Sequence, residues 1–223
     1  MGLFIANEGG DGSGKGTQTR LLVERLENEG FQVATESYPR YEEPVAELVK
    51  RFLDGKYGQP HPELISLPYA VDRMLGSAAI RSAIASPNGV FISDRYSASN
   101  LGHNGSKFDS AEERLEYFEF WRNYEHNILG VPKPDHNFIF QIPVEVAQAN
   151  IDKKEARNYT DKKRDIHEAD ANHLQRTFDT YGLLAQTYPD EYTIIDPMAD
   201  LETMRPIEEI HEELYAAVRR LMN

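Results

Sequence analysis

The sequence predicts an α/β fold with a five-stranded parallel sheet flanked by helices. Short apolar runs bounded by Gly, Pro or Asp alternate with longer segments of helical periodicity, and this alternation is typical of α/β proteins. A glycine-rich turn follows the first apolar run and leads directly into the first helical segment. No repeat, low-complexity tract or break in composition marks a second folding unit, so residues 1–223 are expected to form a single domain.

Five segments have the pattern of buried strands. Each is short and apolar, and most are closed by a turn-forming residue. The predicted strands are residues 3–7, 31–37, 90–93, 137–142 and 192–196. Helical segments lie between them, as expected for parallel pairing.

The predicted helices have their apolar residues on one face and recognisable start or stop signals. Ser110 and Glu113 form a capping box, which predicts a helix start at that point. Pro68 is expected to kink a helix or to begin one. The predicted helices are residues 17–30, 63–85, a segment beginning at 110, a long segment after 165, and 203–221.

Composition restricts the functions that the chain can have. The net charge of −13 repels nucleic acid and anionic membranes, so any phosphate site must be local and neither of these partners is expected. The absence of cysteine excludes disulfides, thiolate metal sites and Cys nucleophiles, and it is consistent with a reducing compartment. The first residues lack the pattern of a signal peptide, and no stretch approaches a membrane span. We therefore expect a cytoplasmic protein.

The glycine-rich turn at residues 9–17 has the spacing of a P-loop. Its glycines allow successive backbone N–H groups to surround phosphate oxygens, and Lys15 can reach the outer phosphates of ATP. Gly16 stands where a Ser or Thr usually holds magnesium, so either Thr17 takes part of that role or carboxylates elsewhere do. The predicted ATP-binding residues are Gly10, Asp11, Gly12, Ser13, Gly14, Lys15, Gly16 and Thr17.

A second cluster of polar residues follows the predicted strand at residues 90–93. Asp94 comes at the carboxyl end of that strand, where it can hold Mg²⁺ or its water shell beside the P-loop. Arg95 follows and is expected to enter the same cleft. A surface ion pair is the alternative for these two residues, and their position beside a P-loop argues against it.

These motifs together resemble thymidylate kinases. The P-loop, Tyr38 to Tyr41, Tyr69 to Arg73, Asp94 to Asn100 and Asp165 to Glu168 occur in the order of that family, across nearly the whole chain. The resemblance implies a P-loop NTPase fold with a mobile lid at about residues 152–166. It also implies a homodimer that transfers the γ-phosphoryl group of ATP to dTMP.

The resemblance also implies roles for individual residues. Arg40 and Arg95 would clamp the acceptor phosphate, because guanidinium groups match phosphate oxygens with paired hydrogen bonds. Tyr69 would stack on the pyrimidine ring, and Arg73 would donate to its O4 edge. Asn100 can both donate and accept, as the N3–H and carbonyl edge of thymine requires.

Further family positions lie near the acceptor sugar, the metal and the transferred phosphate. Glu168 matches a carboxylate near the sugar and the metal, and Arg157 and Arg164 of the lid would stabilise the transferred phosphoryl group. The P-loop offers no Arg, since Gly12 and Ser13 occupy that region. The expected catalytic residues are Asp11, Lys15, Arg95, Arg157 and Arg164; the other acceptor-site residues are Tyr41, Ser99, His103 and Glu168.

Several interpretations stay open. Many thymidylate kinases have a Tyr where this chain has His103, within Gly102-His103-Asn104, so the acceptor is dTMP, dUMP, another monophosphate or a deoxynucleoside. A nucleotide switch or ATPase acting through a protein partner is the alternative of another class. Lys107 either reaches a phosphate or is solvated.

Some prominent residues are expected to be structural. Tyr38 and Tyr96 are assigned to packing. An aromatic stripe at helical spacing is more often core or subunit interface than a ligand site, and here it comprises Tyr117, Phe118, Trp121, Tyr124 and Ile128. Most of the histidines are scattered without ligand spacing, so no transition metal is expected.

Overall fold

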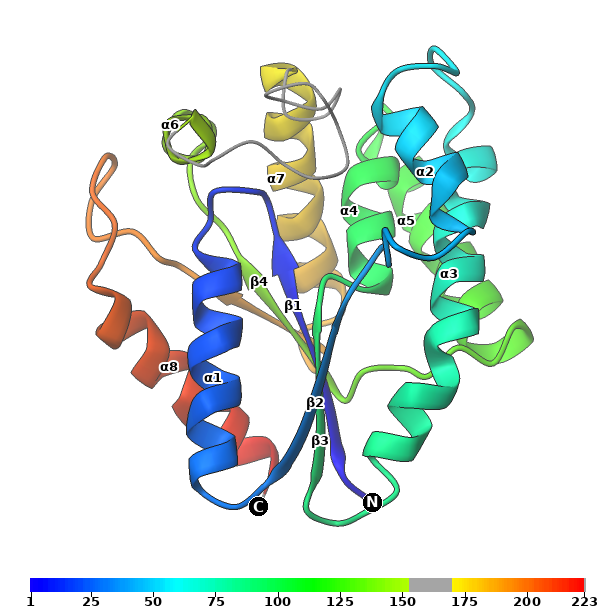
Figure 1. Ribbon diagram of the computed structural model, residues 1–223. Coiled ribbons are helices and arrows are strands. Elements are labelled where there is room, and N and C mark those ends of the chain that lie inside the picture. Colours follow the sequence, from blue (N-terminus) through cyan, green and yellow to red (C-terminus); the bar gives the residue numbers. More distant parts are fainter. Residues whose placement is uncertain (153–169, 223) are drawn as a thin grey trace.

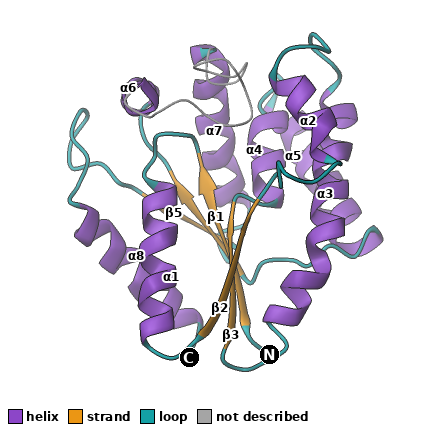
Figure 2. Ribbon diagram, in the orientation of Figure 1, coloured by secondary structure: helices purple, strands orange, loops and turns teal. Residues whose placement is uncertain are grey.

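The structure of the protein, a computed structural model, describes residues 1–152 and 170–222. A five-stranded, entirely parallel sheet forms its centre, and helices cover both faces (Figures 1 and 2). The predicted α/β fold with a parallel sheet is therefore confirmed. In spatial order the strands are β2 (Gln32–Ser37), β3 (Gly89–Asp94), β1 (Leu3–Gly9), β4 (His136–Phe140) and β5 (Tyr192–Ile195).

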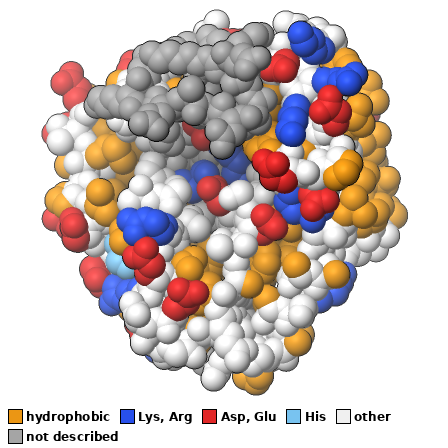
Figure 3. Space-filling view, in the orientation of Figure 1, with side chains coloured by type: hydrophobic (Ala, Val, Ile, Leu, Met, Phe, Trp, Pro, Cys, Tyr) orange, Lys and Arg blue, Asp and Glu red, His pale blue; other side chains and the backbone are white. Residues whose placement is uncertain are grey.

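The strand register brings several chain turns to one edge of the sheet. Strand β1 lies at the centre, where Asn7 pairs with Asp94 of β3 and Gly9 pairs with Phe140 of β4. The carboxyl ends of these three strands are therefore adjacent, which is where open α/β sheets bind ligands. Figure 3 shows side chains of both charges in the middle of one face of the molecule, next to the part that the structure does not describe.

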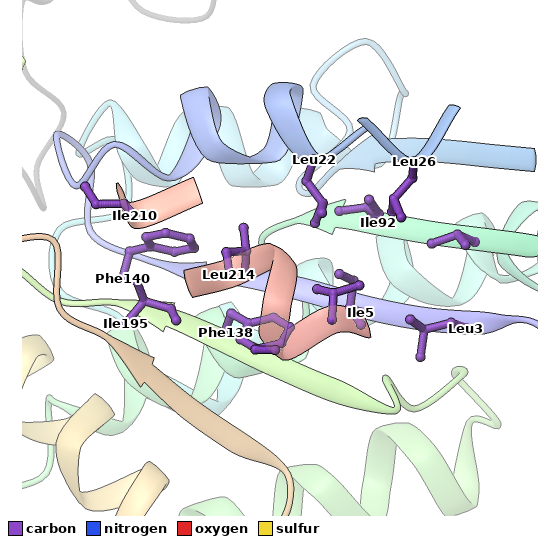
Figure 4. Close-up of a cluster of buried hydrophobic side chains, with 13 residues drawn as sticks. Leu3, Ile5, Leu22, Leu26, Ile92, Phe138, Phe140, Ile195, Ile210 and Leu214 are labelled. Carbon is purple, nitrogen blue, oxygen red and sulfur yellow. The ribbon is translucent and has the colours of Figure 1, made fainter. Parts of the chain in front are cut away.

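One face of the sheet packs against α1 (Lys15–Asn28) and α8 (Ile207–Leu221). Leu22 and Leu26 of α1 and Leu214 of α8 are fully buried there and point toward the strands, as Figure 4 shows. Ile5 of β1 and Ile92 of β3 complete the contact from the sheet side. Burial of this much apolar surface is the main force that holds these elements together.

The other face packs against α3 (Pro62–Ala83), α4 (Ser97–Gly105), α5 (Ala111–Arg122) and α7 (Ala171–Thr187). Tyr117, Phe118 and Trp121 are buried in this second core, as predicted, whereas Ile128 in the adjoining π-helical segment Asn123–Ile128 is 64% exposed. Tyr38 and Tyr96 are buried among apolar side chains, which confirms their assignment to packing.

The helices differ from the prediction in three short elements. Helices α2 (Ala46–Leu53), α4 and α6 (Val144–Asp152) were not predicted, because segments of eight or nine residues show few turns of periodicity. The last helix begins at Ile207 rather than at residue 203, since Pro206 is its N-cap. Pro68 lies inside α3, which begins at Pro62, and the predicted capping box of α5 is present.

The described part of the chain has no helix that is long and apolar enough to cross a membrane. The predicted lid, residues 152–166, begins at the last residue of α6, and the rest of it lies outside the described residues. The helix predicted after residue 165 corresponds to α7, whose N-cap Asp170 accepts a hydrogen bond from the His173 backbone N–H.

Candidate active site

The P-loop follows β1 and ends where α1 begins. Gly12 and Gly14 have φ angles of 83° and 84°, in the region that favours glycine. A Cβ atom at Gly12 would lie 2.5 Å from the carbonyl oxygen of Ala147 in α6, so no side chain fits there. Gly14 is the N-cap of α1 and supplies no side-chain cap, which leaves the helix N-terminus open to an anion.

Lys15 and Asp94 form an ion pair between the first turn of α1 and the end of β3. The Lys15 side chain is almost fully buried, whereas that of Asp94 is 27% exposed. A Cβ atom at Gly16 would lie 4.0 Å from Asp94 Oδ2, so the position that usually carries the magnesium-binding hydroxyl faces this carboxylate. Asp94 therefore supplies the carboxylate oxygen nearest to the position where other P-loops carry the magnesium-binding hydroxyl.

No group of three or more His, Asp or Glu side chains that could hold a metal ion occurs within residues 1–152 and 170–222. The Asp94 carboxylate fits Mg²⁺ nevertheless, because this ion prefers oxygen ligands and keeps several waters beside phosphate oxygens. Thr17, the other candidate, is exposed in the first turn of α1.

Arg95 lies in a sharp turn directly after β3. Its φ angle of 65° is left-handed, and it is the only non-glycine residue with positive φ in the described part of the chain. Its Nη2 donates to Asp11 Oδ2 at 3.0 Å, and its Nη1 lies 3.3 Å from His103 Nε2 and 3.5 Å from Ser99 Oγ. The turn thus brings together four residues that the sequence predicted for one site.

Glu8 holds this turn and was missed by the sequence analysis. Its carboxylate is fully buried and accepts hydrogen bonds from the Tyr96 backbone N–H at 2.7 Å and from Ser99 Oγ at 2.6 Å. Burial raises the pKa of Glu8, while the hydrogen bond from Ser99 and the charge of Arg95 act in the opposite direction. Its two oxygens therefore hold the Tyr96 backbone and the Ser99 side chain, at the start of α4 directly after Arg95.

Arg40, the second predicted phosphate clamp, is bound to Asp72 of α3. Its Nε donates to Asp72 Oδ1 at 2.9 Å, and its backbone N–H donates to Oδ2 at 2.8 Å. Asp72 is 1% exposed and Arg40 is 15% exposed in their side chains. The acidic partner holds the guanidinium in place and leaves part of the Arg40 side chain exposed.

Arg73, on the next position of α3, lies deeper. Its Nε and Nη2 donate to the two carboxylate oxygens of Glu125 at 2.6 and 2.7 Å, and both side chains are almost completely buried. Its Nη1 lies 3.4 Å from the carbonyl oxygen of Tyr96. Asn100 Nδ2 lies 3.4 Å from the same Glu125, so the two predicted base-reading residues share one carboxylate.

Tyr41 and Tyr69 pack from two elements against the apolar side of α2. They contact the cluster of Val49, Phe52 and Leu53 with Ile65 of α3, and both rings are half-buried. Tyr69 and Tyr41 thus belong to one wall near Arg40 and Arg73.

His103 lies on α4, one turn after Ser99. Its ring stacks on that of His173 of α7 with the centroids 5.8 Å apart, and burial lowers its pKa well below the usual range. His103 and Asp11 also line a cavity of about 40 Å³ that is otherwise mainly apolar and reaches Phe140 and Leu174. Burial therefore favours the neutral imidazole, which lines the same cavity as Gly10 and Asp11 of the P-loop.

The remaining predicted residues, Arg157, Arg164 and Glu168, lie outside the described residues. Three further residues of the site, Glu8, Asp72 and Glu125, are carboxylates that were not predicted. An acidic residue inside an apolar run, as in Leu3 to Gly9, is a sequence signal for Glu8. Asp72 and Glu125 give no such signal, because their role depends on contacts between separate elements.

A glycine loop at a helix N-terminus, a lysine paired with an aspartate, and two arginines that follow the adjacent ends of β2 and β3 define a P-loop phosphotransferase that acts on nucleotides. The comparisons with known proteins identify its family. The model of the thymidylate kinase family matches residues 8–214, and the chain belongs to that family.

Individual relatives agree with this assignment. The thymidylate kinase of Mycobacterium tuberculosis is 30% identical over 82% of this chain and 86% of its own. The probable thymidylate kinase of Thermococcus kodakarensis is 27% identical over 99% of this chain and 98% of its own. The thymidylate kinase of Plasmodium falciparum is 26% identical over 99% of this chain and 91% of its own.

Proposed function

We propose that this protein transfers the γ-phosphoryl group of ATP to dTMP, giving dTDP and ADP, and that the residues described above carry out the transfer. The observation that carries the proposal is the position of Lys15, Arg95 and Arg40 just after the adjacent ends of β1, β3 and β2 in a chain of the thymidylate kinase family.

On the donor side, the P-loop holds the ATP phosphates. The backbone N–H groups of residues 10–17 and the N-terminus of α1 bind phosphate oxygens, and Lys15 neutralises charge on the outer phosphates. Members of the family generally use Mg²⁺, which neutralises the charge that develops on the phosphates. Asp94 is the residue that would hold this ion or its water shell, and Lys15 would exchange its contact with Asp94 for one with phosphate.

On the acceptor side, Arg95 and Arg40 hold the phosphate of dTMP. Each guanidinium is already oriented by a carboxylate, Asp11 or Asp72, so little side-chain entropy is lost on binding. Two cations in this position lower the repulsion between two anionic substrates and align the attacking oxygen with the γ-phosphorus.

The base and sugar are assigned to the wall formed by α3 and α4. Tyr69 stacks on the pyrimidine, Arg73 and Asn100 face its edge, and Tyr41, Ser99 and His103 lie toward the sugar and phosphate. Three roles stay predictions: Glu168 near the sugar and the metal, and Arg157 and Arg164 of the lid as cations that stabilise the transition state. The cytoplasmic location also stays a prediction.

We also propose a homodimer formed through α3. The outer side of α3 exposes apolar residues at helical spacing, Leu64, Leu67, Val71, Met74 and Leu75, with exposures of 37–63%. Figure 3 shows hydrophobic side chains along the edge where Figure 1 places α2 and α3. A single chain gains nothing from exposing such a stripe, whereas a second copy would bury it.

The dimer is tested by Leu75→Glu, which places a charge in the stripe. Light scattering after gel filtration should give the mass of a dimer for the unchanged protein and of a monomer for the variant. Leu201→Glu is the matched control, because Leu201 is 85% exposed on a loop elsewhere. A monomeric wild type contradicts the proposal.

The activity is tested by ADP release from ATP and Mg²⁺ with separate acceptors. We expect dTMP to give the highest kcat/KM in a panel that also contains dUMP, dCMP, dGMP, AMP and thymidine. A preference for another monophosphate would overturn the assignment of the base, and ADP release without any acceptor would favour an ATPase or switch.

A further inference from the structure

The imidazole of His103 lies beside the guanidinium of Arg95 because of the way α4 begins. This helix starts at Ser97, two residues after Arg95, and Ser99 and His103 are one helical turn apart on the side that meets Arg95. Arg95 Nη1 lies 3.3 Å from His103 Nε2 and 3.5 Å from Ser99 Oγ. Of these two groups, His103 is therefore the nearer partner of Nη1.

The chemistry of the two groups fixes the direction of this hydrogen bond. A guanidinium group can only donate, so His103 Nε2 is the acceptor and the proton of the neutral ring is on Nδ1. Burial lowers the pKa of His103, and the positive charge of Arg95 acts in the same direction, so the neutral ring that this hydrogen bond requires is favoured. His103 thus serves Arg95 as a neutral acceptor.

The position of the His103 ring is fixed by two aromatic side chains of α7, the helix that packs beside α4 (Figure 1). The ring stacks on His173 with the centroids 5.8 Å apart and the planes at 30°, and it meets the ring of Tyr181 at 6.1 Å and 86°. A Cβ atom at Gly102 would lie 2.6 Å from Tyr181 Cζ, so the two helices are in close contact here. Packing on this side holds the acceptor nitrogen in place.

A neutral partner suits a guanidinium whose charge is needed for a ligand. Asp11 accepts from Arg95 Nη2 at 3.0 Å, and a planar group held at one nitrogen can still pivot about that contact. A second contact, at Nη1, stops the rotation, and Ser99 at 3.5 Å is too distant to do so alone. His103 supplies this contact without a negative charge, whereas a second carboxylate would cancel more of the attraction for an acceptor phosphate.

We propose that His103 is a positioning residue for phosphate binding: its neutral Nε2 holds the Arg95 guanidinium in the orientation that receives the 5′-phosphate of the acceptor. This inference rests on the proposed function, in which Arg95 binds that phosphate. It differs from a direct contact with the sugar, which is the other role open to a residue on this side of the site. The two roles can be separated, because thymidine has the base and sugar of dTMP but no phosphate.

The test measures dissociation constants of dTMP and thymidine by calorimetry, for the wild type and for His103→Met, which has no acceptor nitrogen. We expect the dissociation constant of dTMP to rise about five- to tenfold and that of thymidine to stay within about twofold of wild type. Equal losses for both ligands, or an unchanged constant for dTMP, overturn the inference. Where thymidine binds too weakly for calorimetry, its inhibition constant against dTMP in the ADP-release assay gives the same comparison.

Three further variants separate the hydrogen bond from the packing of the ring. His103→Gln has an amide oxygen at a similar reach and should bind dTMP within about twofold of wild type. His103→Phe keeps a ring against His173 but cannot accept, so it should be as weak as His103→Met, and it replaces that variant if His103→Met does not fold. Wild-type binding in His103→Phe with weak binding in His103→Gln would overturn the inference. His211→Met, on α8 at the other face of the sheet, is the control and should change neither constant.

A double variant tests whether His103 acts through Arg95. In a protein that already carries Arg95→Ala, His103→Met should weaken dTMP binding by less than about twofold more, because the group that His103 holds is absent. A further loss as large as in the wild-type background would mean that His103 contacts the nucleotide directly, and it would overturn the inference. A wild type that does not use dTMP refutes the proposed function, whereas independent effects of the two substitutions refute only the role of His103.

Discussion

The two halves of the proposed active site, one for ATP and one for the acceptor, are built in different ways. The ATP side consists mainly of backbone: glycines with positive φ, a helix N-terminus and a single lysine. The acceptor side consists of side chains, and each of its three arginines is held by its own carboxylate, Asp72, Glu125 or Asp11. The first half can bind the phosphates of any nucleoside triphosphate, whereas the second half must recognise a particular monophosphate.

The difference predicts how each half fails. Removal of a charged group from the ATP side should reduce the rate of phosphoryl transfer and leave acceptor binding intact. Removal of one member of the side-chain network should weaken acceptor binding most, because the group left behind loses the ion pair that orients it.

Lys15→Ala should have the largest effect. Loss of the only cation of the P-loop that reaches the transferred group should lower kcat by about 10³-fold or more. Calorimetric titration of dTMP should give a dissociation constant close to that of wild type. If dTMP binding fell as much as kcat, the separation of the two halves would be refuted.

Arg95→Ala should come next and should act on the acceptor. We expect kcat/KM for dTMP to fall by roughly 10²-fold, since a guanidinium clamp on phosphate and its ion pair with Asp11 are both lost. Steady-state kinetics at saturating dTMP and varied ATP should give a KM for ATP within about threefold of wild type. Arg95→Lys should recover only part of the loss, because an ammonium cannot bind in a bidentate manner.

Glu8→Gln should have a smaller effect of the same kind. The amide keeps one oxygen to accept from Tyr96 or Ser99 but not both, so the turn at Arg95 loosens. We expect the KM for dTMP to rise about tenfold with little change in the KM for ATP. Glu29→Gln, at a surface hydrogen bond with Tyr215, is the control and should have no effect on either KM.

Lys107→Met should have the smallest effect on turnover and should raise stability. The folded protein lowers the pKa of this amine from 10.5 to about 8, so the cost of burying the charge is fully present below pH 8 and disappears as pH rises toward 10.5. Denaturant unfolding at pH 7 should show a gain of about 1–3 kcal/mol for the variant. The gain should shrink above pH 9, and a gain independent of pH would assign it to packing.

The sequence predicted these two halves unequally. The position of the P-loop between a strand and a helix was predicted correctly, because its glycines and its lysine are close in sequence and have a fixed spacing. Arg40 and Arg73 were predicted from the family resemblance, but their partners Asp72 and Glu125 were not. Those contacts join α3 to other elements, and no local pattern contains them. Helix α4 was missed for a related reason, since Ser97–Gly105 contains two glycines and an Asn pair in only nine residues.

The left-handed backbone of Arg95 has a consequence for how this chain can evolve. A non-glycine residue at a φ of 65° costs about 1–2 kcal/mol, which glycine at the same position would not incur. Laboratory selection for heat resistance alone would therefore enrich Gly at position 95 and apolar residues at position 107. Gly at position 95 would be lost again as soon as the selection required phosphoryl transfer, because the guanidinium of Arg95 is needed there.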